Sequence, residues 1–322
     1  MNKEGSLSIN SENIFPIIKK WLYSDHDIFF RELVSNGCDA VTKLKKLDMI
    51  GEYTIPEGKE LCVKVTADAE TKTITFTDNG IGMDANEIDQ YINQIAFSGA
   101  RDFLDKYKDK TNDDQIIGHF GLGFYSAFMV ADRVTIDSLS YKEGAKAVHW
   151  ESDEGTSFEM TDSAKTEIGT TITLYLNEDS YEFCNEYRAK EILDKYCSFM
   201  PIPIYFEAIK TAEEQARIDE AEKKAKEEEE KRKAEEAAKK VADGEAVEAE
   251  TEAEPAEKAP EAPKPINETT PLWAKHPNEC TDEEYKEFYH RVFHDYKEPL
   301  FWIHLNMDYP FNLKGILYFP KI

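Results

Sequence analysis

Four polar residues recur at helical spacing between positions 32 and 43, and together they could support hydrolysis. At about 100° per residue, Glu32, Asn36, Asp39 and Lys43 fall on one narrow stripe of a helix, and apolar residues cover most of its remaining surface. The stripe is narrower than an ordinary solvated face. An amide oxygen can coordinate a hard cation, and a carboxylate one turn away can orient a water molecule for attack. On this segment alone, a surface helix edge is an equally good interpretation.

A short motif with two glycines, Asp78 to Met83, directly follows a predicted strand. A carboxylate held at the end of a strand can accept a hydrogen bond from an amino group such as the exocyclic one of adenine. The two glycines, Gly80 and Gly82, allow the backbone to approach a flat ring closely. Taken alone, the motif is more typical of a glycine turn with an Asx cap.

A second glycine-rich segment, Gly118 to Phe124, precedes a predicted helical run from Tyr125 to Met129. Free N–H groups at the start of a helix, reached through a glycine loop, bind phosphate well. The segment is not the G-x-G-x-x-G motif that follows a strand in dinucleotide-binding proteins. It is not a P-loop either, since no Gly-Lys-Ser/Thr follows. By itself it is a weak signal.

The elements that must position these motifs alternate between helical and strand patterns from residue 1 to about 207. We expect a helix over Phe15 to Tyr23 and a long helix that begins at Asp27 or its neighbour. Mostly antiparallel strands with inserted helices indicate a two-layer α/β sandwich rather than a doubly wound sheet. The expected strands are Leu61 to Ala67 and Thr73 to Thr77, which form a hairpin, followed by Arg133 to Leu139, Ala147 to Glu151, Ser157 to Thr161 and Thr170 to Leu176.

Composition argues against several classes of protein. The formal net charge of -26 disfavours a duplex nucleic acid partner bound through phosphate neutralisation. Five scattered cysteines without a C-x-x-C pair indicate the reduced thiols of a cytoplasmic protein and no zinc site. The N-terminus lacks an apolar signal region, and no stretch approaches the roughly 18 apolar residues of a membrane span. We therefore expect a soluble cytoplasmic protein.

The chain changes character after residue 207, and we expect three regions: residues 1–207, a charged linker over 208–265, and 266–322. Between Ala212 and Pro265, 19 Asp/Glu stand against 11 Lys/Arg with hardly any large apolar residue, so this segment cannot bury a core. Its first part has the composition of a solvated helix. Its second part, which contains four prolines, should be extended.

Order resumes beyond the linker. Thr281 to Glu284 reads as a capping box that begins a helix. An aromatic stripe at helical spacing is expected to belong to a core, and it consists of Tyr285, Phe288, Tyr289, Val292, Phe293 and Tyr296. Two strands, Leu300 to Leu305 and Gly315 to Pro320, end the chain. Some 57 residues make a poor independent domain, so we interpret this region as the truncated start of a second domain and the chain as an N-terminal fragment.

The order of the motifs resembles that of the GHKL ATPase superfamily: a helix with a carboxylate and an amide, Asp-x-Gly-x-Gly, a glycine-rich segment before a helix, and Gly169-Thr170 at a strand start. Within it, essentially the whole chain resembles the ninety-kilodalton heat-shock protein family in its bacterial form. The resemblance implies a two-layer α/β sandwich of the Bergerat type, then a charged linker and the start of an α/β middle domain. It also implies an ATP-dependent chaperone that binds ATP or ADP with Mg²⁺, hydrolyses ATP slowly and couples lid closure to the binding of unfolded client proteins.

The resemblance implies roles for individual residues. Glu32 corresponds to the general base that orients the hydrolytic water, and Asn36 corresponds to the ligand of Mg²⁺ and phosphate. Asp78 corresponds to the carboxylate that recognises adenine, and it should be ionised at pH 7. The other implied ATP-binding residues are Asp39, Gly82, Met83, Ser98, Gly99, Gly118, His119, Phe120, Gly121, Gly123, Phe124 and Thr170.

Further implications concern assembly and turnover. The resemblance implies a homodimer in the full-length protein, with an exchanged strand at Leu7 to Ile9. Phe97 stands where family members commonly have a lysine, which puts a phosphate contact from that position in doubt. The family also uses a middle-domain arginine that would follow residue 322. A missing positive charge at a developing phosphate can lower the rate by about 10³-fold, so we expect very slow turnover by this fragment.

Alternative functions fit the sequence less well, with one exception. A DNA-repair or topoisomerase relative would need a basic surface, against the net charge. A sensor kinase is excluded, since no phosphoacceptor helix fits before the helix that bears Glu32. His290 and His294 are four residues apart, but Arg291 replaces the glutamate that a zinc protease needs. A module that binds nucleotide without hydrolysing it stays open.

Overall fold

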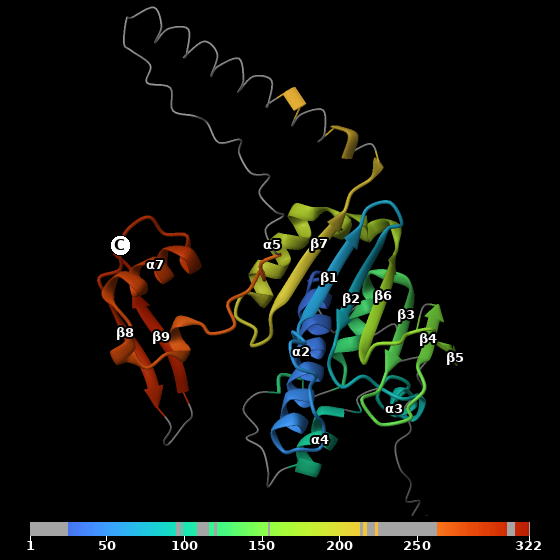
Figure 1. Cartoon of the computed structure of the whole chain (residues 1–322). Helices are drawn as coiled ribbons and strands as arrows, with labels where there is room; N and C mark the ends of the chain where they lie inside the picture. The colour runs from blue at the N-terminus through green and yellow to red at the C-terminus, as the bar shows by residue number, and fades with distance from the viewer. Residues whose placement is uncertain are drawn as a thin grey trace, which may run out of the picture.

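The computed structural model describes residues 25–94, 97, 99–107, 116–118, 121–153, 155–212, 215–217, 223–224, 263–307 and 313–321. The chain forms a sandwich of helices and a sheet, with a smaller C-terminal group of elements beside it (Figure 1). The predicted helix over Phe15 to Tyr23, the predicted strand at Leu7 to Ile9 and most of the charged linker lie outside the described residues.

A mixed sheet of seven described strands forms one layer of the sandwich. The strands follow the spatial order β5-β4-β3-β6-β2-β1-β7, and all neighbouring pairs are antiparallel except β1 and β7. The six predicted strands are confirmed with ends shifted by one or two residues, and β7 is an addition to them. Their bounds are β1 (Val63–Asp68), β2 (Thr73–Asp78), β3 (Ala131–Leu139), β4 (Val148–Asp153), β5 (Glu159–Asp162), β6 (Gly169–Leu176) and β7 (Ile204–Ile209).

Helices cover one face of this sheet and form the second layer (Figure 1). The long helix starts at Ile28, as predicted, and contacts β2, α5 and the short 3-10 helix η2. The predicted run at Tyr125 is therefore helical, but it has the 3-10 rather than the α geometry. The bounds are α2 (Ile28–Met49), α3 (Ala85–Tyr91), α4 (Gly99–Tyr107), η2 (Gly123–Met129), η3 (Glu178–Cys184) and α5 (Glu186–Cys197). This arrangement confirms the two-layer α/β sandwich.

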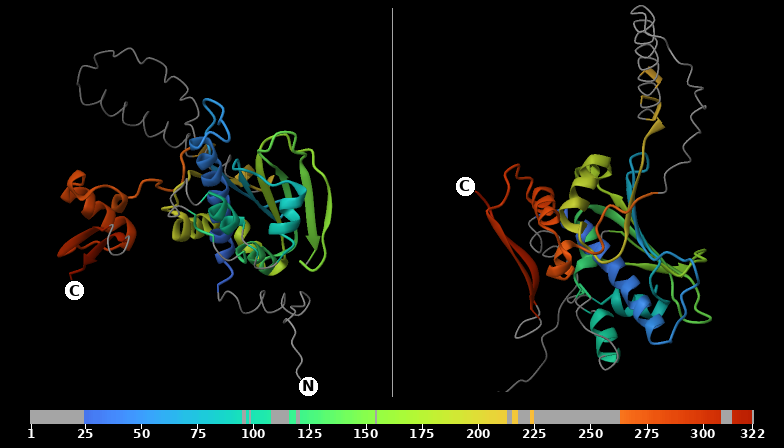
Figure 2. Two further views of the ribbon diagram at one scale, coloured as in Figure 1. Left: turned by 90° about the horizontal axis from the view of Figure 1, so that it is seen from below. Right: turned by 60° about the vertical axis from the view of Figure 1, so that its left-hand side comes forward.

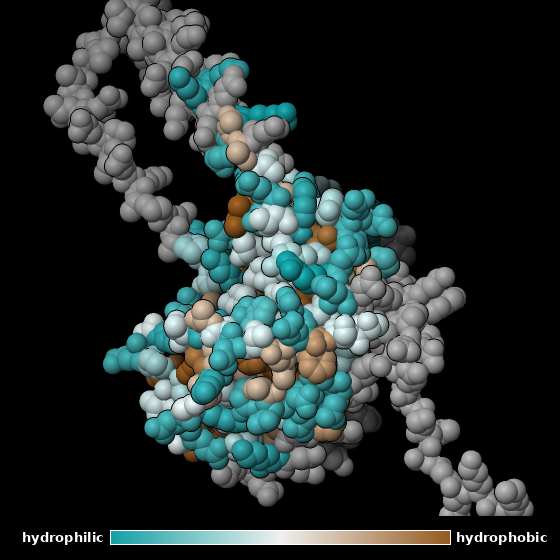
Figure 3. Space-filling view, turned by 90° about the vertical axis from the view of Figure 1, so that its right-hand side faces the viewer, coloured by the Kyte–Doolittle hydropathy of each residue, from teal (hydrophilic) through white to brown (hydrophobic). Residues whose placement is uncertain are grey.

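Aromatic packing holds α2 against the sheet. Phe29 and Phe30 are fully buried, and both pack edge to face on Phe76 of β2 and Phe183 of η3, with ring centroids 5.2 to 6.2 Å apart. Each such buried side chain contributes about 1.5–3 kcal/mol relative to an exposed one. The opposite face of the sheet carries paired threonine hydroxyls. Polar side chains also dominate the surface at the β5 end of the sheet (Figure 3).

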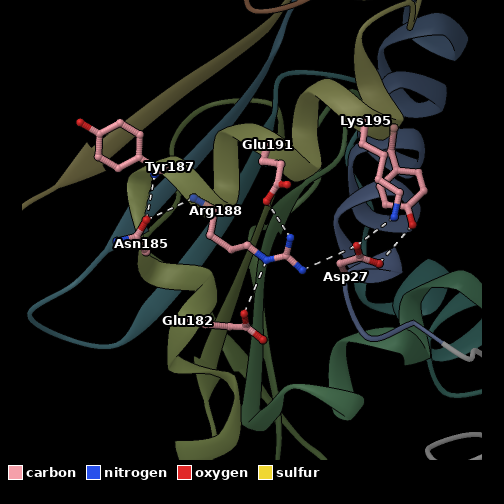
Figure 4. Close-up of polar contacts among 8 residues, drawn as sticks. Asp27, Glu182, Asn185, Tyr187, Arg188, Glu191 and Lys195 are labelled. Atoms are coloured by element: carbon pink, nitrogen blue, oxygen red, sulfur yellow. Dashed lines mark hydrogen bonds and ion pairs between the residues drawn. The ribbon is translucent and has the colours of Figure 1, made fainter. Parts of the chain in front are cut away.

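The first turn of α2 is tied to α5 by a group of polar contacts around Asp27 (Figure 4). The buried Asp27 carboxylate accepts hydrogen bonds from the Tyr196 hydroxyl at 3.1 Å and the Lys195 ammonium at 3.3 Å. The Arg188 guanidinium lies 4.0 Å from the same carboxylate and 3.5 Å from Glu182. These contacts fix where the long helix begins, and hence where its polar stripe lies.

The C-terminal group consists of two short 3-10 helices, one α-helix and a two-stranded sheet. The predicted capping box is confirmed, since Thr281 and Glu284 cap each other's backbone N–H groups. Phe199, which follows α5, packs on Trp273 and Phe288 and so joins this group to the sandwich. The group lies on the side of the sandwich that α5 occupies (Figure 2). The bounds are η4 (Leu272–Ala274), η5 (Pro277–Glu279), α7 (Asp282–Phe293), β8 (Phe301–Met307) and β9 (Leu313–Phe319).

The predicted aromatic core stripe of this region is correct only in its first half. Tyr285, Phe288 and Tyr289 are buried, but Phe293 is 55% exposed and Tyr296 is 100% exposed. Phe293 is the last residue of α7 and lies at its exposed end, and Tyr296 falls outside the helix because His294 takes a left-handed conformation that turns the chain away. Helical spacing therefore does not extend to Tyr296.

Asn267 fastens the chain that follows the charged segment to the sandwich. Its side-chain oxygen accepts from the backbone N–H of Ile204 at 2.8 Å, and its amide donates to the carbonyls of Met200 and Ile202. The backbone N–H of Ile266 also donates to the carbonyl of Ile204. Asn267 is buried, and its three contacts satisfy the polar atoms of its side chain. The position at which the chain rejoins the sandwich is therefore fixed.

Several global features bear on function. No helix within the described ranges is long and apolar enough to cross a bilayer. All five cysteines are free thiols. In the described part of the chain, no group of three His, Cys, Asp or Glu side chains is placed to hold a metal ion.

Candidate functional site

A cavity of about 1130 Å³ lies between α2 and the ends of β2 and β6. Twelve of the fifteen predicted site residues line it, from five separate stretches of the sequence. They are Glu32, Asn36, Asp39, Asp78, Gly82, Met83, Gly99, Gly118, Gly121, Gly123, Phe124 and Thr170. The remaining three, Ser98, His119 and Phe120, lie outside the described residues. Motifs far apart in the sequence thus meet around one hollow.

One end of the cavity, which we name the base corner, contains Asp78, Gly82, Met83 and Thr170. Asp78 is the last residue of β2, and its buried carboxylate accepts a hydrogen bond from the backbone N–H of Gly80 at 2.9 Å. Asp78 pairs with Thr170 across the neighbouring strands, so the two side chains lie side by side on the helix-covered face. A carboxylate acceptor and a hydroxyl therefore face the cavity together.

Burial raises the pKa of Asp78 to about 7, because removal from water disfavours the carboxylate. Hydrogen bonds and positive charges oppose this effect and lower the pKa. They come from the Gly80 N–H, the Lys165 ammonium, the Thr170 backbone and the Lys43 ammonium. The ionised Asp78 that we expect from the sequence is the form that accepts a hydrogen bond from an amino group, and burial of the carboxylate in the free cavity works against that form. A donor that hydrogen-bonds to Asp78 would shift the balance back toward the carboxylate.

The turn after Asp78 requires glycine at position 82. Gly82 has a φ of +60°, and a Cβ there would collide with the carbonyl oxygen of Leu139 at the end of β3. The turn is held to the same strand end by two hydrogen bonds, from the N–H of Tyr141 to the Ile81 carbonyl and from the N–H of Met83 to the Ser138 hydroxyl, each 2.8 Å long. The base corner is thus fixed through backbone contacts.

Ser138 is a residue of this corner that the sequence motifs did not reveal. It is fully buried on β3 and pairs with Thr170 of β6, and the two hydroxyl oxygens lie 2.9 Å apart. Its only sequence signal is the strand alternation that places it on the helix-covered face. A small hydroxyl residue at such a position is common, which is why the sequence alone does not single it out.

The other end of the cavity, which we name the flap corner, contains Glu32, Asn36, Asp39, Gly118, Gly121 and Gly123. Asp39 fastens the glycine-rich segment to α2, because its carboxylate oxygens accept from the backbone N–H groups of Ile117 at 2.8 Å and Gly118 at 2.7 Å. A Cβ on Gly118 would lie 3.6 Å from the side-chain oxygen of Asn36. The segment therefore starts directly above the predicted cation ligand.

Glu32 lies at the mouth of the flap corner with its two oxygens in different surroundings. Oε1 is ion-paired with the guanidinium of Arg31 at 2.6 Å, a contact that sequence reading did not anticipate. Oε2 faces Gly123, and a Cβ at that position would collide with it unless the carboxylate moved. The glycine thus allows the start of η2 to approach the carboxylate closely.

Two aromatic residues complete this corner. Phe97 lines the cavity and stacks on Tyr91, with ring centroids 6.0 Å apart and an interplanar angle of 17°. Phe124 is buried and packs edge to face on Trp150. Neither ring carries a charge, so any positive charge that meets a phosphate here must come from other groups.

Comparisons with known proteins agree with this geometry. Residues 28–178 match the family described as histidine kinase-, DNA gyrase B- and HSP90-like ATPase, and residues 182–322 match the Hsp90 protein family. The chain is 48% identical to the chaperone protein HtpG of Bacteroides fragilis over 320 residues, which is 99% of this chain and 40% of that protein. It is 44% identical to HtpG of Porphyromonas gingivalis over 322 residues, covering 100% and 41% of the two chains. For HtpG of Shewanella pealeana the identity is 35% over 302 residues, covering 93% and 42%.

The chain thus spans about 40% of the length of these curated relatives. The matches extend through both the sandwich and the C-terminal group, and the resemblance drawn from the motifs is confirmed. The chain belongs to the Hsp90 family and carries its GHKL-type ATPase fold.

Proposed function

We propose that this protein is an ATP-dependent molecular chaperone whose nucleotide site is the cavity between the base corner and the flap corner. The observation that carries the proposal is the placement of complementary chemistry at the two ends of one hollow, with a buried acceptor at one end and a carboxylate, an amide and glycine N–H groups at the other. The relatives named HtpG are called chaperone proteins, which supports the same function.

Asp78 and Thr170 would recognise the purine base. The Asp78 carboxylate would accept a hydrogen bond from the exocyclic amino group of adenine, and this contact would favour the ionised form of the acid. The Thr170 hydroxyl, directly or through one water, would contact the adjacent ring nitrogen. Gly82 and Met83 would cover the ring, because the turn that holds them lies against the end of β3.

The flap corner would bind the triphosphate. Gly118, Gly121 and Gly123 lie on the segment that closes the cavity beside α2, where backbone N–H groups are suited to phosphate. Asn36 has a side-chain oxygen near this segment, and a Mg²⁺ ion commonly takes one protein oxygen together with phosphate oxygens and water. Such an ion would neutralise charge that develops on the phosphates.

Glu32 would act as the general base. Its Oε2 faces the glycine segment, while Oε1 is held by Arg31, so one oxygen is directed toward the place expected for the terminal phosphate. In the hydrolysis step this carboxylate would orient a water molecule and accept its proton as the oxygen attacks phosphorus.

The proposal extends to the whole protein. We propose that nucleotide binding closes the lid, that closure is coupled to binding of unfolded clients, and that the full-length protein acts as a cytoplasmic homodimer. The five free thiols fit a reducing compartment. We also propose that residues 1–322 alone hydrolyse ATP very slowly, because the resemblance places a further catalytic arginine beyond them.

Calorimetry and turnover assays with the purified chain, ATP and Mg²⁺ test this function. We expect ATP binding in the unchanged protein, a loss of affinity of at least 100-fold in Asp78→Asn, and retained binding without turnover in Glu32→Ala. Asp162→Asn, which changes an exposed aspartate on β5, is the matched control and should behave as the unchanged protein. Absence of ATP binding by the unchanged chain, or equal binding by Asp78→Asn, would rule the proposal out.

A further inference from the structure

Three side chains form one row across the middle of the sheet at the base corner. Asp78 of β2, Thr170 of β6 and Ser138 of β3 are paired residues on adjacent antiparallel strands, so they share one face. All three are buried, with Ser138 at 0% exposure. Asp78 and Thr170 line the cavity, whereas Ser138 lies one strand further from it. Ser138 can therefore act on a ligand only through Thr170 and the Met83 turn.

The hydrogen bonds around Ser138 restrict its single hydroxyl proton. Its oxygen accepts from the N–H of Met83 at 2.8 Å, so the proton must point elsewhere. Two acceptors are within reach, Thr170 Oγ1 at 2.9 Å and the carbonyl oxygen of Gly169 at 3.3 Å. In the shorter contact either hydroxyl can be the donor, and the arrangement considered further is the one in which Ser138 donates to Thr170.

A hydrogen bond donated by Ser138 would determine the direction in which the Thr170 hydroxyl proton points. When Thr170 Oγ1 accepts that bond, its own proton is left to donate toward the cavity. The base corner then presents an acceptor at Asp78 and a donor at Thr170, side by side. This order matches the edge of a 6-aminopurine, which offers an amino donor beside an unprotonated ring nitrogen.

A 6-oxopurine presents the reverse order, with a carbonyl acceptor beside a ring N–H donor. When Asp78 is ionised and Thr170 donates, both of its groups would meet a like partner in the base corner. A site built around hydrogen bonds rejects such an analogue because its buried polar groups are left without partners. A water molecule between Thr170 and the ring would keep the same direction of donation. It would accept from the Thr170 hydroxyl and donate to the ring nitrogen.

We propose that Ser138 is a positioning residue that orients the Thr170 hydroxyl as a donor and so makes the cavity selective for 6-aminopurine over 6-oxopurine nucleotides. This inference rests on the proposed nucleotide-binding function and adds the residue that sets base selectivity. Without the Ser138 hydroxyl, Thr170 is free to rotate and to serve as donor or acceptor, so the discrimination between the two bases weakens.

The test compares the affinities of adenosine and inosine triphosphates, measured by calorimetry with Mg²⁺, in the unchanged chain and in Ser138→Ala. We expect the ratio of the two affinities to fall by about five- to tenfold in the variant. Ser138→Thr keeps the hydroxyl and should restore the ratio. Ser180→Ala, another buried serine that does not line the cavity, should leave it unchanged. An unaltered ratio in a folded Ser138→Ala would overturn the inference.

A second measurement needs no variant and applies even where Ser138→Ala does not fold. In 1-deazaadenosine triphosphate a C–H group replaces the ring nitrogen that would accept from Thr170. We expect the unchanged chain to bind this analogue about five- to tenfold more weakly than ATP. Equal affinities would show that no donor is held toward that nitrogen. A different result would refute the proposed nucleotide-binding function: the unchanged chain would then not bind ATP at all.

Discussion

The base corner and the flap corner of the cavity are built in different ways. The base corner consists of strand ends and a turn that is held by backbone contacts, and its side chains are buried. The flap corner consists of a helix edge and a glycine segment fastened to it by the carboxylate of Asp39. We call the base corner the rigid end, and we call the flap corner the adjustable end because its attachment to α2 passes through a side chain that can rotate.

The largest expected effect comes from breaking the rigid end with Gly82→Ala. The substituted residue would keep a left-handed backbone, which costs about 1–2 kcal/mol, and its Cβ would also collide with the Leu139 carbonyl, which belongs to a strand and cannot move aside. We expect a clear fall in the thermal midpoint and loss of ATP binding. Thermal unfolding followed by circular dichroism and calorimetry measures both. Unchanged stability and affinity would contradict the view that this corner is rigid.

The matched change at the adjustable end, Gly123→Ala, should separate binding from turnover. Its Cβ meets only the end of the Glu32 side chain, which is able to rotate away. We expect ATP affinity within a few-fold of the unchanged chain, and turnover lower by about 100-fold because the carboxylate is displaced by around an ångström. Parallel calorimetry and phosphate-release assays test this. A variant that loses binding as completely as Gly82→Ala would remove the distinction between the two corners.

A pH series tests the electrostatics of the rigid end. Because burial raises the pKa of Asp78 to about 7 and an amino donor favours the carboxylate, ATP binding below that pH requires loss of a proton. The affinity for ATP should therefore be about tenfold lower at pH 6 than at pH 8. Inosine triphosphate carries the same phosphates without the amino group and should show no such rise with pH. Identical profiles for the two nucleotides would contradict this assignment of the titrating group.

The smallest effect is expected for Asp39→Asn, which loosens the attachment of the glycine segment. An amide keeps one acceptor oxygen, so only one of the two N–H groups of Ile117 and Gly118 retains its partner. We expect about tenfold faster hydrogen exchange at whichever of these two amides loses its partner, and only a few-fold loss of ATP affinity. Exchange measured by nuclear magnetic resonance or mass spectrometry provides the readout. Unaltered exchange would show that Asp39 does not hold the segment.

The sequence predicted those parts of the structure that follow from local periodicity or a short motif. The polar stripe of α2 and the hairpin that ends at Asp78 are of this kind, and they account for the ends of the cavity. Features that depend on neighbouring strands were not predictable. Ser138 matters only because β3 pairs with β6, and the raised pKa of Asp78 reflects how completely the fold excludes water from it.

The errors in the C-terminal group have a similar origin. The spacing from Tyr285 to Tyr296 fits a helix throughout, but the left-handed turn at His294 ends the helix before the last aromatic residue. The local composition marks that turn only weakly, since helix ends of this kind usually carry glycine. A continuous pattern therefore overestimates the length of the element that it describes.

The contacts of Asn267 have a consequence for the acidic stretch that precedes it. The sheet strand β7 ends at Ile209, and the chain rejoins the same sheet edge at Ile266, where β7 begins. Both ends of the stretch between Ile209 and Ile266 are therefore attached to the same strand. The entropy cost of joining two fixed ends varies only with the logarithm of the number of residues between them. Doubling or halving that number therefore changes the free energy by about 0.6 kcal/mol. Insertions and deletions in this stretch should leave both the nucleotide cavity and the elements after Asn267 in place.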